Sequence, residues 1–145
     1  MKKSHSRIST LYREYIIEHS THPHNYRVLD NATATAHVNN RLCGDDMTLY
    51  CRIVAGHIEE ASFTGTGCAI MKASASLLTD AVMSMPLDIA LELAANVQHF
   101  LNGDDMALPT ISPFQALSGV RGFPSRINCA LLPFSALRQI LTTNR

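Results

Sequence analysis

The apolar residues near the N-terminus recur at helical spacing and predict an amphipathic helix over residues 7–19. Its apolar stripe consists of Ile8, Leu11, Tyr12, Tyr15 and Ile16. The pattern ends before Pro23, because a proline and the residue before it resist a helical conformation. Such a stripe needs an apolar core to cover it.

Alternating apolar and polar positions next predict a β-hairpin. Every second residue of the run 47–54 is apolar, and after an Ala55-Gly56 turn the run 58–63 returns along it. The earlier run 33–38 contains β-formers among many small residues, and we expect it to add a third antiparallel strand. The expected sheet is small.

The second half of the chain is predicted to be helical. The predicted elements are helices over residues 69–83, 87–101 and 130–141, with a short helical turn at 113–119. Cys68 directly precedes the first of these helices, and Gly103 follows the second as a C-terminal signal. A break is expected at residues 122–124, and Cys129 is expected near the start of the final helix.

This order of elements defines an α+β fold, in which helices pack on one face of a small antiparallel sheet of about three strands. The chain has 145 residues, of which 46% are hydrophobic, so it can build a core without disulfide bonds. We therefore expect residues 1–145 to form a single domain.

Charge and composition exclude several partners. Twelve basic residues balance twelve acidic ones, and no basic stripe interleaved with aromatics is present, so nucleic acid is not an expected partner. No run approaches the roughly 20 apolar residues that span a bilayer, and the basic N-terminus is not followed by an apolar signal segment. We expect a soluble, cytoplasmic protein without a membrane partner. Thiols stay reduced there, so the four cysteines favour metal binding or catalysis, with two disulfides in a secreted protein as the alternative.

Three of the four cysteines lie in turn-forming or helix-starting sequence. Their contexts are Cys43-Gly44-Asp45, Gly65-Thr66-Gly67-Cys68 and Arg126-Ile127-Asn128-Cys129. Thiolates bind soft metals and attack sulfur electrophiles, so three thiols and one carboxylate would form a metal site or a sulfur-handling centre if the fold brings them together. Cys51 differs, because it shares the apolar face of a predicted strand and is interpreted as core filling.

Each context also allows a plainer interpretation. Cys43 and Asp45 can face one ion across a glycine corner, or Cys43 can be an incidental residue of a turn. Cys68 opens a helix, where the dipole favours a thiolate, although a packed cysteine is the alternative. Arg126 stands three residues before Cys129 and would favour its thiolate or bind a carboxylate of a partner.

The histidines are weaker candidates. His22 and His24 flank a proline and can chelate a metal, but loop histidines are more often surface residues. No histidine is assigned to the site. The cysteine spacing is far too wide for a zinc knuckle, so only the fold can assemble a shared site.

The motifs, taken in order, resemble the NifU/IscU family of iron–sulfur cluster assembly proteins, and most closely its SufU branch. The segments that carry the resemblance are His22-Pro23-His24-Asn25, Cys43-Gly44-Asp45, residues 65–76 and residues 119–130. IscU-type scaffolds have a histidine directly before the third cysteine, where this chain has Asn128. The chain departs from the family at residues 131–134, where Pro133 is expected in the first turn of a helix.

The resemblance implies a SufE/NifU-like fold and a zinc ion held by Cys43, Asp45, Cys68 and Cys129. It also implies that Cys43 accepts persulfide sulfur after a histidine of the partner replaces it on zinc, and that Arg126 contacts that partner. The partner would be a SufS-type cysteine desulfurase, and the sulfur would pass to downstream cluster assembly proteins. The first hypothesis is therefore a zinc-dependent sulfurtransferase. The second is a scaffold that assembles and transfers an iron–sulfur cluster, and the third is a zinc-stabilised interaction domain without turnover.

Overall fold

The computed structural model describes residues 2–143, with side chains from residue 8 onward. The elements in chain order are α1 (Lys2–Thr21), β1 (Ala34–Asn40), β2 (Asp45–Val54), β3 (His57–Thr66), α2 (Ala69–Val82), α3 (Leu87–Leu101), the 3-10 helix η1 (Pro113–Val120) and α4 (Pro124–Thr143). The predicted α3 matches its observed bounds, and the other predicted elements are present with shifted ends.

The three strands form one antiparallel sheet in the order β1-β2-β3. Leu49 in the middle strand lies opposite Ala36 on one side and Phe63 on the other, and all three side chains are buried. The hairpin turn has positive φ at Ala55 and Gly56, which matches the right-handed twist of the flanking strands. The prediction of a small three-stranded antiparallel sheet is confirmed.

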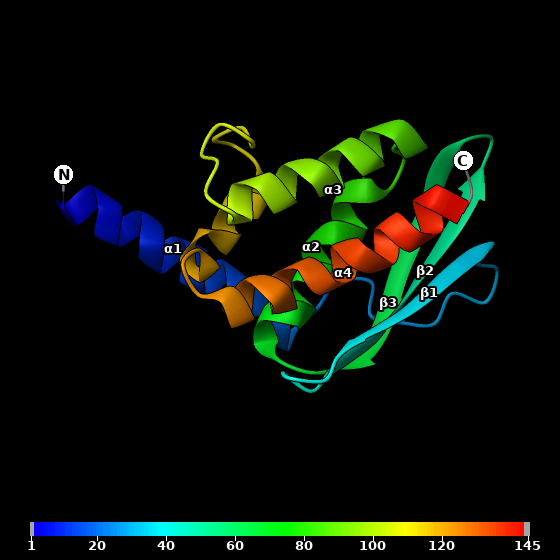
Figure 1. Ribbon diagram of the computed structural model, residues 1–145, viewed down its shortest axis with the longest axis horizontal. Coiled ribbons are helices and arrows are strands. Elements are labelled where there is room, and N and C mark those ends of the chain that lie inside the picture. The colour runs from blue at the N-terminus through cyan, green and yellow to red at the C-terminus, as the bar shows by residue number, and fades with distance from the viewer. Residues whose placement is uncertain (1, 144–145) are drawn as a thin grey trace.

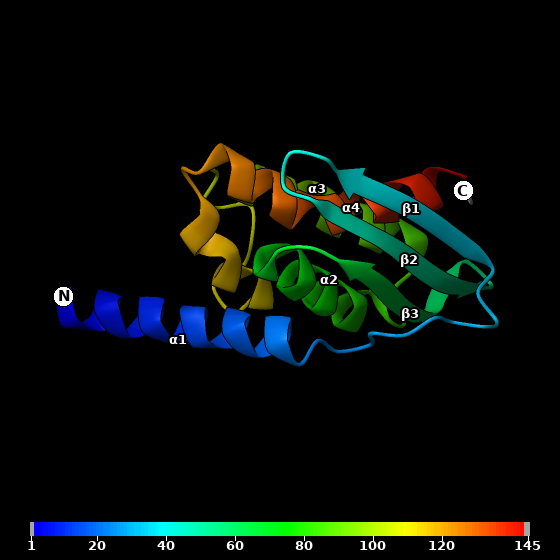
Figure 2. The same ribbon diagram turned by 90° about the horizontal axis from the view of Figure 1, so that it is seen from below.

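Helices cover one face of this sheet. α2 packs on β3, α4 packs on β1 and β2, and the two helices also contact one another. α3 packs on α4 on the side away from the sheet (Figure 1), while no helix of the described residues lies in front of the opposite face of the sheet (Figure 2). The predicted α+β arrangement is confirmed. Among the described helices, none is both long and apolar enough to cross a membrane.

α1 lies along the side of the molecule against α2 and η1, and its N-terminal half projects beyond the other elements (Figures 1 and 2). Near its C-terminal end His19 is 3% exposed, and its Nδ1 lies 2.6 Å from Ser76 Oγ in α2. Ser76 Oγ also accepts a hydrogen bond from the backbone N–H of His24. This polar contact fastens the end of α1 to α2.

The start of the last helix differs from the prediction. α4 begins at Pro124, six residues before the predicted start at residue 130, because proline at the first helical position has a suitable φ and sacrifices no hydrogen bond. Cys129 therefore lies in the second turn of α4. Pro133 lies inside the helix, contrary to the expectation of a first-turn position. The side chains around it, including Phe134 and Leu137, are buried, so tertiary packing maintains the helix across the proline.

Candidate metal centre

The β1–β2 turn, the start of α2 and the first turns of α4 supply the predicted ligands, and the start of α2 lies near the β1–β2 turn (Figure 1). Cys43 lies in the turn between β1 and β2, and Asp45 is the first residue of β2. Cys68 is the N-cap of α2, and Cys129 faces the same region from α4. We refer to the side chains of these four residues as the donor cluster. Cys43 and Asp45 are close in the sequence, whereas Cys68 and Cys129 come from two other segments that are distant from them and from each other.

The distances within the donor cluster suit a single ion. Ligand atoms of Cys43, Asp45 and Cys129 all lie within 4.8 Å of one another. Cys68 Sγ lies outside that group of three but only 3.7 Å from Asp45 Oδ2. Around a tetrahedral zinc, with Zn–S of about 2.3 Å and Zn–O of about 2.0–2.2 Å, neighbouring ligand atoms are about 3.5–3.8 Å apart. The structure thus brings three of the four predicted ligands within 4.8 Å of one another and places the fourth, Cys68, beside Asp45.

Asp45 gives the strongest sign that a cation belongs here. Its residue is only 1% exposed, and one oxygen, Oδ1, accepts a hydrogen bond of 2.8 Å from the Cys68 backbone N–H. Among the described side chains, no Lys, Arg or His nitrogen lies within 4.0 Å of this carboxylate. A buried carboxylate without a counter-charge is costly, and a divalent ion would supply that charge. The donor set therefore fits a divalent metal.

The glycine arm, residues 65–67, makes room for Asp45. A Cβ added at Gly67, whose φ is +151°, would lie 2.3 Å from Asp45 Oδ1. A Cβ at Gly65 would lie 2.3 Å from the backbone oxygen of Asp46. Tyr26 Oη holds the arm from outside, because it donates to the Gly65 carbonyl and accepts from the Gly65 N–H. Both glycines are needed for this close approach of β2 and β3 to the start of α2.

The thiols of the donor cluster differ in burial. Burial raises the pKa of the Cys129 thiol, and its contacts with the other three donors raise that pKa further. A bound divalent ion would reverse this effect, because it stabilises thiolates. Cys68 Sγ accepts a hydrogen bond of 3.4 Å from the Met71 N–H, as an N-cap does. Cys51 lies in the core, fully buried, and burial raises its pKa to about 12, which confirms its interpretation as core filling.

Cys43 is the donor with the most freedom to move. It is half-buried, and it lies in a turn where Gly44 has a φ of +70°. Outside the donor cluster its Sγ has two weak contacts, at 3.6 Å from Asn40 Nδ2 and 3.9 Å from the Ser125 carbonyl. The neighbouring Leu42 is 95% exposed. Cys43 can therefore shift without disturbing a helix or a strand.

The remaining candidate residues lie outside the donor cluster. The Arg126 guanidinium is 4.7 Å from the centre of the Phe123 ring, on the exposed start of α4. His24 pairs with Asp80 of α2. Asp80 follows Cys68 by twelve positions, so it lies about 18 Å from Cys68 along the axis of α2. No described histidine belongs to the donor cluster.

Sequence reasoning missed the residues that surround the donors. Asn40 and Tyr26 contact the site through the turn at Cys43 and through the glycine arm. The position of Asn40 three residues before Cys43 was an available signal, because asparagine commonly organises turns. Nothing local identifies Tyr26, since its partner Gly65 is 39 positions away.

Comparison with known proteins agrees with these observations. The family model of the NifU-like N-terminal domain matches residues 11–129. The iron–sulfur cluster assembly scaffold protein IscU of Streptococcus pyogenes is 34% identical over 94% of this chain and 86% of its own length. The zinc-dependent sulfurtransferase SufU of Bacillus subtilis is 36% identical over 91% of this chain and 90% of its own length.

A solved structure supports the same relationship. A protein of Fervidobacterium islandicum, described as an iron–sulfur cluster assembly scaffold for the SUF system, superposes with a TM-score of 0.80 at 27% identity, over 88% of this chain and 94% of that one. The similarity to the Bacillus SufU favours the SufU-type branch. The chain belongs to the NifU-like N-terminal domain family, whose relatives named above are iron–sulfur cluster assembly proteins of the IscU and SufU types.

Proposed function

We propose that this protein is a zinc-dependent sulfurtransferase, which accepts persulfide sulfur from a SufS-type cysteine desulfurase and passes it to iron–sulfur cluster assembly. One observation supports this proposal most strongly. The buried Asp45 carboxylate, which has no basic partner among the described side chains, lies within 4.8 Å of the thiols of Cys43 and Cys129. The name of the Bacillus relative supports both zinc and sulfur transfer.

In this proposal Cys43, Asp45, Cys68 and Cys129 hold zinc, and the whole chain acts as one domain. Zinc suits the site because it takes four sulfur and oxygen ligands and keeps thiols deprotonated at neutral pH without redox chemistry of its own. The buried Asp45 and Cys129 would anchor the ion, and the accessible turn would make Cys43 the ligand that reacts. Reduced thiols are required, which favours a cytoplasmic setting.

The transfer step is a thiol–persulfide exchange. The Cys43 thiolate attacks the outer sulfur of the donor persulfide, so that a new S–S bond forms at Cys43 Sγ while the S–S bond of the donor breaks. The electron pair of the broken bond stays on the donor cysteine, which leaves as a thiolate. No external oxidant or reductant is needed for this step. A reductant or a downstream acceptor then removes the sulfur from Cys43.

The test uses purified protein with a SufS-type desulfurase, free cysteine and a reductant. Sulfide release should exceed that of the desulfurase alone, and Cys43→Ser should abolish the excess while the protein remains folded. Cys51→Ser is the matched control, because it removes a thiol that lies outside the donor cluster. Equal sulfide release with and without the wild-type protein would refute the proposal.

A second candidate is a scaffold on which an iron–sulfur cluster is assembled. The similarity to the Streptococcus scaffold protein favours it, because that relative covers as much of the chain as the sulfurtransferase does. Against it, Asn128 occupies the position before Cys129 and no described histidine adds to the donors. Anaerobic reconstitution with iron and sulfide separates the two. A stable cluster that can be transferred to an acceptor protein would favour the scaffold.

A further inference from the structure

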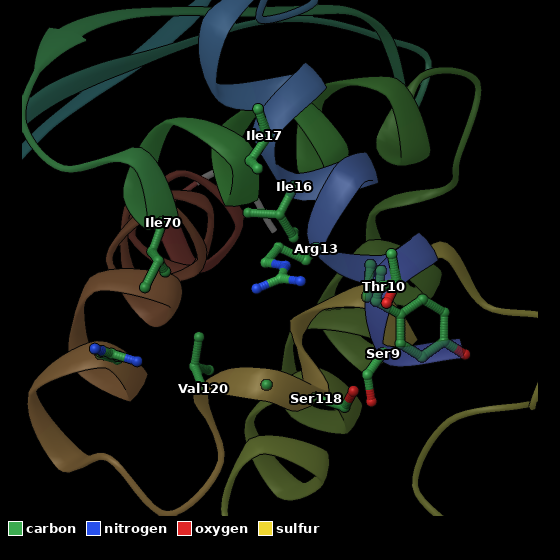
Figure 3. A pocket seen from close by; sticks show the side chains of 12 residues that line it. Ser9, Thr10, Arg13, Ile16, Ile17, Ile70, Ser118 and Val120 are labelled. Atoms are coloured by element: carbon green, nitrogen blue, oxygen red, sulfur yellow. The ribbon is translucent and has the colours of Figure 1, made fainter. Parts of the chain in front are cut away.

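A hollow of about 590 Å³ lies beside the donor cluster, between α1, η1 and the first turns of α2 and α4 (Figure 3). Its apolar wall comes from three elements, with Ile16 and Ile17 on α1, Ile70 on α2 and Val120 on η1. Ile17 is 53% exposed, so this wall is open to solvent. An exposed aliphatic surface of this kind is typical of a site that receives another apolar group.

Two arginines give the hollow a positive charge. Arg13 on α1 and Arg126 on α4 both line it, and none of the described lining residues is acidic. Figure 3 shows the Arg13 side chain pointing from α1 into this space, with Ile70 and Val120 across from it. Among the described side chains, no carboxylate lies within ion-pair distance of either guanidinium. The hollow thus combines aliphatic walls with two unneutralised cations.

The hollow and the reactive thiol belong to one face. Ile70 lies in the first turn of α2, which Cys68 caps, and Arg126 precedes Cys129 by three positions on α4, so that Arg126 and Cys129 are neighbours on the helix surface. The Ser125 carbonyl, next to Arg126, is 3.9 Å from Cys43 Sγ. A protein that approaches Cys43 therefore also approaches the side of the hollow that Arg126 forms.

We infer that the hollow binds an acidic segment of the protein that donates sulfur, with Arg13 as the main cation on the α1 side. Aliphatic side chains of that segment would cover Ile16 and Ile70, and a carboxylate would be held by the guanidinium of Arg13, since guanidinium groups bind carboxylates in a bidentate manner. The inference rests on the proposed function for the identity of the partner. It adds a second anchoring point, on α1, that orients the partner relative to Cys43.

The test is the charge reversal Arg13→Glu. Arg13 is exposed, so the variant should fold and bind zinc as the wild type does. Its dissociation constant for the SufS-type desulfurase, measured by calorimetric titration, should rise about 10- to 50-fold, and Arg13→Gln should give a smaller rise of about 3- to 10-fold. Added salt should weaken wild-type binding more than binding of Arg13→Glu. The matched control is Arg138→Glu on the far half of α4, which should change binding less than about twofold.

A photo-crosslinker tests the chemistry of the occupant. With p-benzoylphenylalanine in place of Ser9, which lines the same hollow, irradiation should join the protein to a desulfurase peptide that contains Asp or Glu among aliphatic residues. A crosslinked peptide without a carboxylate, or unchanged affinity of Arg13→Glu at equal zinc content, would overturn the inference while leaving sulfur transfer intact. Failure of the wild-type protein to bind the desulfurase at all would overturn both this inference and the proposed function.

Discussion

The substitution Asp45→Asn should stabilise the metal-free protein and weaken metal binding, two effects of opposite sign. Asparagine has the same shape, so its Oδ1 can still accept from the Cys68 N–H, and its Nδ2 can donate to Cys68 Sγ at the position where Oδ2 lies 3.7 Å away. Only the charge is lost. Asp45 is 1% exposed and has no basic partner among the described side chains, so its charge destabilises the fold when no metal is bound.

The magnitude follows from two opposing terms. Loss of the charge weakens the hydrogen bond from Cys68 by about 1 kcal/mol. Relief of the desolvation penalty of an unpaired buried ion contributes several kcal/mol in the other direction. The free energy of unfolding of the metal-free Asp45→Asn variant should therefore be higher by about 1–2 kcal/mol. With zinc present, loss of one of four ligands should weaken zinc binding about 100-fold, which removes about 2.7 kcal/mol of ligand stabilisation.

The assay is chemical denaturation of wild type and variant, once with a chelator and once with excess zinc. The variant should unfold at higher denaturant concentration than the wild type in chelator, and at lower concentration in zinc. Asp46→Asn is the matched control, because this neighbouring carboxylate is half-exposed and pairs with His37 at 2.8 Å on the outer face of the sheet. It should shift neither curve by more than about 0.5 kcal/mol. Equal destabilisation of Asp45→Asn in both conditions would refute a ligand role and make Asp45 a structural residue.

Three further predictions concern the surroundings of the site. Cys51 should resist iodoacetamide in the native protein at pH 8 and react only after unfolding, because burial raises its pKa to about 12 and blocks access; mass spectrometry of labelled peptides checks this. Tyr26→Phe should lower zinc affinity about 3- to 10-fold in a chelator competition, because the glycine arm loses its hydrogen bonds to the Tyr26 hydroxyl. Tyr50→Phe should leave zinc affinity unchanged, because the Tyr50 hydroxyl contacts Thr64 instead. Burial, with a smaller contribution from the nearby His24, holds the pKa of His19 below its ordinary 6.5, so as pH falls the unfolded chain takes up the proton first. Wild-type stability should therefore drop as pH falls below 6.5, by up to about 1.4 kcal/mol per pH unit until the lowered pKa is reached, and His19→Asn should flatten that slope in urea titrations.

Local patterns identified the elements with good accuracy wherever a segment has one clear apolar face. The hairpin of β2 and β3 followed from alternation around Ala55-Gly56, and α3 from its periodicity and the glycine after it. α4 shows where this reasoning fails. The polar residues after Pro124 carry little apolar periodicity, so the helix start was placed at residue 130 instead of Pro124. Pro133 then lies in a helix interior that only tertiary packing maintains.

Most of the candidate site was accessible from sequence because each donor lies in a local context with its own physical meaning. Cys43 and Asp45 border a glycine, Cys68 caps a helix, and Cys51 alternates with core residues. Resemblance to a family joined them into one proposed ligand set. The residues that act on the donors from a distance, Tyr26 on the glycine arm and Arg13 beside Ile70, had no such local signal.

The sequence by itself determined the kinds of elements, the order in which they occur and the chemical types of the donors, because these depend on side-chain identity and on neighbours within a few positions. Only the tertiary structure decided that Cys43, Asp45 and Cys129 meet, with Cys68 next to Asp45, that Asp45 is buried without a basic partner among the described side chains, and that a hollow with two arginines adjoins the first turns of α2 and α4. These properties depend on contacts between segments that are far apart in the sequence, such as Cys43 and Ser125, which are 82 positions apart. Such contacts exist only once the helices pack on the sheet.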